Sequence, residues 1–81
     1  MNGKEFTAKQ DALKAWVIQR GGEWRLSHRS VPYALFPYRD SKASVCYFRK
    51  TNIYRLFYPF AQDNQEKWDF NSIEELEAFA K

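Results

Sequence analysis

Aromatic and basic side chains share two short runs near the middle of the chain. Residues 45–50 read Val-Cys-Tyr-Phe-Arg-Lys, and residues 53–58 read Ile-Tyr-Arg-Leu-Phe-Tyr. The faces of aromatic rings can stack on nucleobases, which contributes roughly 1–3 kcal/mol per base, and Arg and Lys attract phosphates in a salt-sensitive way. The two runs therefore hold the residue types that a nucleic-acid-binding surface requires.

Basic residues also concentrate around these runs. Residues 21–60 contain seven basic and two acidic residues, a net charge of +5, whereas residues 61–81 contain two basic and six acidic residues, a net charge of −4. Cations that contact phosphates contribute affinity and position rather than base specificity. The candidate residues for binding nucleic acid or another partner combine these cations with rings between them: Arg25, Arg29, Arg39, Lys42, Phe48, Arg49, Lys50, Tyr54, Arg55 and Phe57.

Few residues of this chain could support catalysis or hold a metal ion. His28 is the only histidine and lies between Ser27 and Arg29 without an evident carboxylate to orient it. Cys46, the only cysteine, lies in an apolar run, which predicts a buried and unreactive thiol. One cysteine and one histidine are too few for a structural zinc site, and the three glycines form no phosphate-binding loop. We therefore expect a non-enzymatic binding domain with no catalytic residues, no metal ion and no cofactor.

The composition favours one small domain over residues 1–81 with a core built from rings. Aromatic residues make up 19% of the chain, and each ring can bury about 150–250 Å². A hydrophobic fraction of 44% and a charged fraction of 28% are ordinary for a folded globular domain. The single cysteine suits a reducing compartment, and the chain lacks a long apolar stretch. We expect a cytoplasmic protein that does not insert into membranes.

Two capping patterns predict the helices. A Thr-x-x-Gln pattern at Thr7 predicts the start of a helix over residues 8–20, and the Gly-Gly pair at 21–22 is typical of a helix end. A Ser-x-x-Glu pattern at Ser72 predicts a closing helix over residues 73–80. Both segments carry apolar residues at three- and four-residue spacing, so each helix should bury one side.

Between the helices, short runs rich in Tyr, Phe, Val and Ile are typical of strands. The predicted strands cover residues 23–29, 33–38, 43–50 and 53–60. The sequence thus predicts an α+β fold: an N-terminal helix, a three- or four-stranded antiparallel sheet, and a C-terminal helix. Residues 67–70 alternate and would add a short fifth strand. We expect both helices to pack on one face of the sheet.

The hairpin formed by residues 43–60 can be divided into two faces. If Thr51 and Asn52 form a tight turn, period-two alternation separates its side chains. One face would carry Tyr47, Arg49, Tyr54, Leu56 and Tyr58, and the other Cys46, Phe48, Lys50, Ile53, Arg55 and Phe57. Both faces hold rings and cations, so the pattern leaves open which one the helices cover.

Three functions are compatible with these observations. Binding of DNA or RNA through the basic and aromatic hairpin is our first expectation. The alternative is a small inhibitor of the phage or mobile-element kind, acting against host defence as anti-CRISPR proteins do. It would occlude a protein of a nucleic-acid-handling complex, because Tyr, Trp and Arg are favoured at protein interfaces. Self-association through an exposed ring surface is the third, so the chain would be a monomer or a homodimer.

The strand-to-helix ending at residues 68–79 is similar to the ending of integrase arm-binding domains and of some anti-CRISPR proteins. Helix capping and amphipathicity alone produce such an ending. The resemblance therefore assigns no family.

Overall fold

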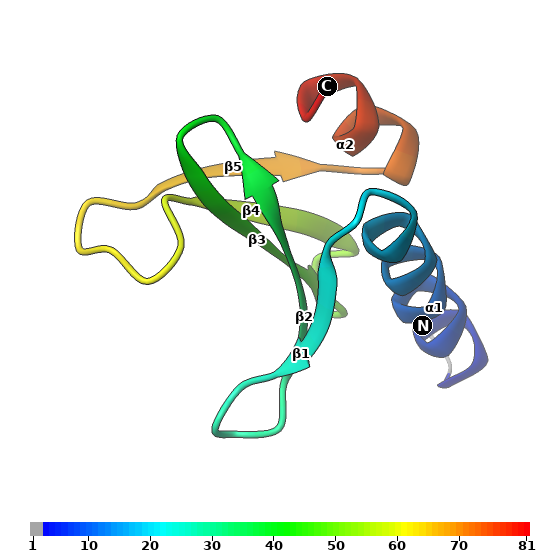
Figure 1. The fold of residues 1–81 in the computed structure, drawn as a ribbon. Coiled ribbons are helices and arrows are strands. Elements are labelled where there is room, and N and C mark those ends of the chain that lie inside the picture. Colours follow the sequence, from blue (N-terminus) through cyan, green and yellow to red (C-terminus); the bar gives the residue numbers. More distant parts are fainter. Residues whose placement is uncertain (1–2) are drawn as a thin grey trace.

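The chain forms a helix, five consecutive strands and a second helix. The computed structural model describes residues 3–81. The elements are α1 (Gly3–Gln19), β1 (Glu23–Leu26), β2 (Pro32–Tyr38), β3 (Ser41–Phe48), β4 (Ile53–Tyr58), β5 (Glu66–Phe70) and α2 (Ile73–Phe79). The strands form one antiparallel sheet in the order β1-β2-β3-β4-β5 (Figure 1). The predicted α+β class is confirmed, and the short last strand is part of the sheet.

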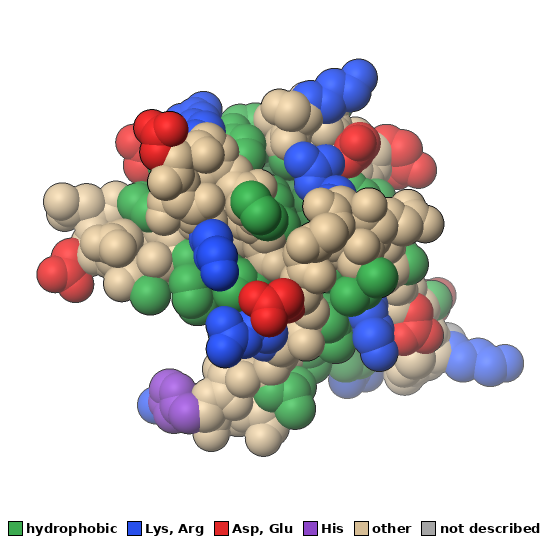
Figure 2. Space-filling view, viewed as in Figure 1, with side chains coloured by type: hydrophobic (Ala, Val, Ile, Leu, Met, Phe, Trp, Pro, Cys, Tyr) green, Lys and Arg blue, Asp and Glu red, His purple; other side chains and the backbone are tan. Residues whose placement is uncertain are grey.

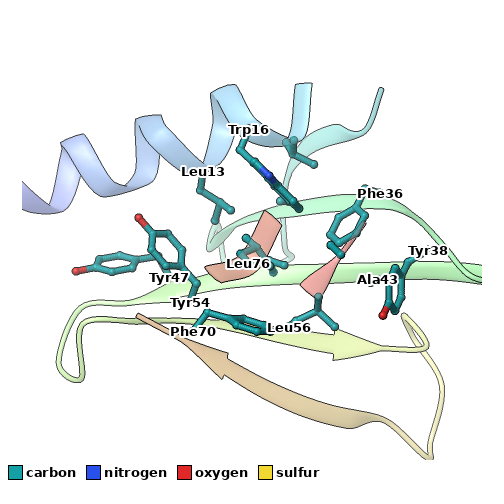
Figure 3. Packing of buried hydrophobic residues seen from close by; sticks show 14 residues of the cluster. Leu13, Trp16, Phe36, Tyr38, Ala43, Tyr47, Tyr54, Leu56, Phe70 and Leu76 are labelled. Atoms are coloured by element: carbon teal, nitrogen blue, oxygen red, sulfur yellow. The ribbon is translucent and has the colours of Figure 1, made fainter. Parts of the chain in front are cut away.

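Both helices cover the same face of this sheet, as the sequence predicted (Figures 1 and 3). The apolar side of α1 contributes Leu13, Trp16 and Val17, and α2 contributes Leu76. The facing strand side chains are Ala34, Phe36, Tyr38, Ala43, Val45, Tyr47, Tyr54, Leu56 and Phe70. Rings dominate the contacts: the Trp16 ring meets the Phe36 ring edge-on at 5.1 Å between centroids. The aromatic content of the sequence is thus largely used by the core.

The helices are also joined to each other by polar contacts. Trp16 Nε1 and Arg20 Nη1 both donate to Glu77 Oε2, at 2.8 and 2.7 Å. The Arg20 guanidinium lies 4.8 Å from the Trp16 ring centroid, in a cation–π contact. These contacts hold α2 against α1, so the helix-covered side of the sheet is closed by both elements.

The ends of several elements differ from the prediction. Helix α1 already includes Gly3, so Thr7 lies inside the helix and the predicted capping box there is wrong. The Phe6 ring packs against the core and lies 6.0 Å from the Tyr47 ring, which stabilises the additional turn. Strand β4 ends at Tyr58 because Pro59 cannot donate a ladder hydrogen bond. At α2 the prediction is confirmed, since Ser72 Oγ accepts from the Glu75 amide at 3.2 Å.

The loop between β3 and β4 has four residues, 49–52, and the predicted two-residue turn is wrong. Phe48 pairs with Ile53 across the hairpin. Asn52 adopts a φ of 55°, and its side-chain oxygen accepts from the Tyr47 hydroxyl at 2.7 Å. The register differs from the predicted one by two residues. Because side chains alternate with a period of two, the division of the strand residues between the two faces is unchanged.

Candidate functional site

The sheet face opposite the helices carries about half of the candidate residues. Its side chains alternate along each strand with those of the core. We call this surface the open face. The paired registers assign to it Glu23, Arg25, Tyr33, Leu35, Pro37, Lys42, Ser44, Cys46, Phe48, Ile53, Arg55, Phe57, Lys67 and Asp69. Figure 2 shows hydrophobic and basic side chains side by side over the strands to the left of α1.

Cations outnumber carboxylates on the open face. It holds four basic residues, Arg25, Lys42, Arg55 and Lys67, and two acidic ones, a net charge of +2. Lys67 belongs to the acidic C-terminal part of the sequence, and sequence reasoning missed it. Antiparallel pairing of β4 with β5 brings it opposite Phe57, with Nζ 5.9 Å from that ring centroid. The alternation of residues 67–70 was the signal that could have placed it.

Arg55 is engaged in an ion pair on this face. Its Nε and Nη2 donate to Asp69 Oδ1 and Oδ2 at 2.7 and 3.2 Å. This hydrogen bonding lowers the pKa of the Asp69 carboxyl and raises the pKa of the Arg55 guanidinium. The guanidinium also lies 5.1 Å from the centroid of the Phe48 ring, which is 38% exposed. A phosphate that approaches Arg55 must therefore compete with Asp69.

A recess of about 480 Å³ opens between two loops on this face. We call it the open-face pocket. The strands contribute Tyr33, Ser44, Cys46 and Phe57 to its lining. The end of β1 and the loop that follows contribute Leu26, Ser27 and His28, and the loop between β4 and β5 contributes Phe60, Ala61 and Gln65. Both loops lie away from the helices in Figure 1, in cyan and yellow. Its volume lies within the roughly 300–1,000 Å³ of typical ligand sites.

The loop between β4 and β5 is braced against the sheet. The Phe60 amide donates to the Lys42 carbonyl at 2.8 Å, and the Phe60 ring stacks on the Tyr33 ring at 5.8 Å. Within the loop, Gln65 Nε2 donates to the Pro59 carbonyl at 3.1 Å. These contacts hold the Phe60 ring as one wall of the open-face pocket. Neither Tyr33, which lies outside the predicted hairpin, nor Phe60, its last residue, was among the predicted binding residues.

The opposite wall is ordered by Ser27. Its Oγ accepts from the Arg29 amide at 3.2 Å and from the Val31 amide at 3.1 Å. These hydrogen bonds end β1 at Leu26, three residues before the predicted end. Leu26 is 63% exposed and Val31 49%, so this loop presents apolar side chains beside Arg29.

Cys46 lies on the open face rather than in the core. It is half-buried and contributes to the open-face pocket. Burial raises the pKa of its thiol, so at neutral pH the nucleophilic thiolate is scarce. The expectation of a buried thiol is wrong, because the helices cover the other face and leave Cys46 half-buried. The thiol is nevertheless a poor nucleophile, because it stays protonated at neutral pH.

Tyr54 must be removed from the candidate binding residues. Its side chain is 1% exposed, packs under α1 with Tyr47, and donates to the Lys9 carbonyl at 3.4 Å. Burial, followed by the nearby Tyr47 and Glu74, raises the pKa of Tyr54 to about 12. Tyr54 is therefore a core residue that a partner on the surface cannot contact.

The remaining candidates do not form one surface. Five of them share the open face: Arg25, Lys42, Phe48, Arg55 and Phe57.

Two other candidates lie toward the helix-covered side. The Arg39 guanidinium lies 5.0 Å from the Tyr38 ring centroid, and Arg49 lies 5.4 Å from the Phe6 ring of α1. Arg29 and Lys50 are exposed in the loops that follow β1 and β3. The basic segment of the sequence is thus spread over two sides and one end of the molecule.

Neither a metal site nor a membrane-spanning helix is found in residues 3–81. No three His, Cys, Asp or Glu side chains of this part of the chain gather closely enough to hold a metal ion. No helix within the same residues is both long and apolar enough to cross a membrane.

Comparisons with protein-family models, with curated proteins and with solved structures found no significant match.

Proposed function

We propose that this protein is a non-enzymatic domain that binds nucleic acid through the open face of its sheet. The observation that carries the proposal is the position of Phe48 and Phe57. Both rings lie on the face that the helices leave uncovered, and each has a cation over it, Arg55 and Lys67 respectively. Rings supply stacking for bases, and the adjacent cations attract the phosphates that join those bases.

The charge of the open face supports moderate, salt-sensitive binding. Arg25, Lys42 and Lys67 are exposed around the rings and are available to phosphates. Asp69 neutralises part of this field through its ion pair with Arg55. With a net charge of +2 on the face, stacking must contribute a substantial share of the affinity.

The experiment compares two pairs of substitutions that lower the net charge equally. Arg25→Ala with Lys67→Ala removes two cations of the open face, whereas Lys4→Ala with Lys14→Ala removes two exposed cations of α1. Fluorescence anisotropy would measure binding of labelled DNA and RNA oligonucleotides at about 50 mM and about 200 mM salt. Circular dichroism would confirm that both variants remain folded.

We expect salt-sensitive binding by the unmodified protein. The open-face pair should weaken it about tenfold or more, and the α1 pair about twofold or less. Equal losses in both variants would show binding by net charge alone, and no binding at the lower salt would contradict the proposal.

A second candidate function is favoured by the exposed apolar residues next to Arg29. Leu26 at the end of β1 and Val31 in the loop that follows are 63% and 49% exposed, and exposed apolar side chains close together often mark protein interfaces. This is compatible with the inhibitor of a nucleic-acid-handling protein. Loss of partner capture in a Leu26→Ser, Val31→Ser variant that still binds oligonucleotides normally would favour this second function.

A further inference from the structure

We propose that the partner is a single strand of nucleic acid and that one of its unpaired bases enters the open-face pocket. This inference rests on the proposed function and names the form of nucleic acid that the same face would bind. It follows from three features: the aromatic rings that line the pocket, its position between two loops, and the cations near two of its rings.

The pocket has the shape and chemistry that a single base requires. Phe57 and the stacked rings of Tyr33 and Phe60 supply flat apolar surfaces. Ser44 and His28 add groups able to hydrogen-bond with base edges. A mostly apolar recess with a few polar groups is the usual form of a site for a small flat ligand. Because both loops are braced by hydrogen bonds, the recess exists before any ligand arrives.

A base in a duplex cannot reach these rings without leaving its stack. Double helices are read by protruding helices or ribbons that enter a groove, whereas Phe57 lies in a recess between two loops. Unstacking and unpairing a base costs free energy in a duplex, and little in a strand that is already single. Stacking on these rings needs a base face that is free of its neighbours, which favours a single strand.

Cations lie near two of the rings of the pocket. Arg25 pairs with Tyr33 across β1 and β2, and Lys67 lies over Phe57. The third ring belongs to Phe60, whose amide donates to the Lys42 carbonyl at 2.8 Å, so the backbones of these two residues are neighbours. A strand with one base in the recess would thus meet a positive group on several sides. The exposed ring of Phe48, farther along the face, provides a stacking position for a neighbouring base.

The experiment has two arms, both on the unmodified protein. The first measures, by anisotropy, the affinity for labelled single-stranded DNA and RNA of mixed sequence and for the matching duplexes. The second follows alkylation of Cys46 by iodoacetamide with and without saturating oligonucleotide. Because Cys46 is the only cysteine and lines the pocket, its rate of modification reports whether the open face is covered at the pocket.

We expect at least about tenfold tighter binding of a single strand than of its duplex. The bound strand should slow Cys46 alkylation several-fold. Equal affinity for duplex, or unchanged alkylation with the strand bound, would overturn this inference while leaving nucleic-acid binding intact. No binding of any oligonucleotide would instead remove the proposed function itself. Duplex binding that an Arg49→Ala, Lys50→Ala variant loses would move the contact to the loop at residues 49–52.

Discussion

At the scale of single residues, Asp69 decides how much of the positive charge on the open face a ligand can use. Its carboxylate holds Arg55 through two hydrogen bonds, at 2.7 and 3.2 Å. Replacing Asp69 by Asn keeps the side-chain volume and removes the negative charge. Since Arg55 would then be free to contact phosphate, Asp69→Asn should tighten nucleic-acid binding about three- to tenfold at low salt and less at high salt.

The matched control for this variant is Glu75→Gln, which changes the net charge equally on the exposed side of α2. Anisotropy titrations of both variants check the prediction. A gain in affinity that is the same for both would mean that general charge is responsible. Weaker binding by Asp69→Asn would mean that Asp69 positions Arg55 for the ligand instead of competing with it.

At the scale of elements, the connection between α1 and β1 depends on two neighbouring glycines for different reasons. A Cβ on Gly22 would lie 2.6 Å from the Leu35 carbonyl oxygen and 2.7 Å from Val17 Cγ2. Gly21 has open space around it but adopts a φ of +80°. Gly22 thus allows α1 to approach β2 closely, while Gly21 allows the helix to end.

We predict that Gly22→Ala destabilises the fold more than Gly21→Ala does. Overpacking against a backbone oxygen and the core should cost about 3 kcal/mol, whereas the strained backbone at residue 21 should cost about 1 kcal/mol. For a domain of this size, each kcal/mol lowers the Tm by about 4–8 °C. Thermal unfolding followed by circular dichroism measures both values. Equal shifts would show that α1 and β2 can separate at no cost, contrary to the packing described above.

At the scale of the whole molecule, the ring-built core makes stability sensitive to alkaline pH. The pKa of Tyr54 is raised to about 12 in the folded protein, compared with about 10 in an unfolded chain. A group whose pKa is raised by folding contributes stability that is complete below its unfolded pKa and is lost as the pH rises through the folded pKa. The phenol of Tyr54 should therefore oppose the folded state above about pH 10.

A comparison with Tyr54→Phe isolates this contribution. Between about pH 9 and about pH 11, the free energy of unfolding of the unmodified protein should fall by about 1 kcal/mol more than that of the variant. Urea titrations followed by tryptophan fluorescence measure the difference, and titration of lysines affects both proteins alike. The same pH dependence in both would mean that Tyr54 ionises as readily in the folded protein as in the unfolded chain.

The distribution of charge over the molecule differs from its distribution along the chain. Along the chain, residues 21–60 are basic and residues 61–81 are acidic. In the fold, Lys67 and Asp69 of the acidic part join the open face, while Arg39 and Arg49 of the basic part lie toward the helices. The exposed carboxylates of α2, such as Glu75, lie on the helix side.

Local pattern alone determined the type and order of the elements. Ser72 caps α2 as its spacing with Glu75 predicted, and alternation in β3 and β4 separated the two faces of the hairpin correctly. That separation held even though the loop between them is two residues longer than predicted. A shift by two leaves every side chain on its own face, so this property is insensitive to the error.

Only the tertiary structure decided which face is open. Both faces of the hairpin carry rings and cations, and no local pattern distinguishes a ring that a helix will cover, such as Tyr54, from one left on the surface, such as Phe48. Likewise, Tyr33 and Phe60 are distant in sequence and become neighbours because the loop before β5 folds back over the sheet. Burial and pocket formation depend on contacts between distant segments, whereas capping and alternation depend on neighbours in the chain.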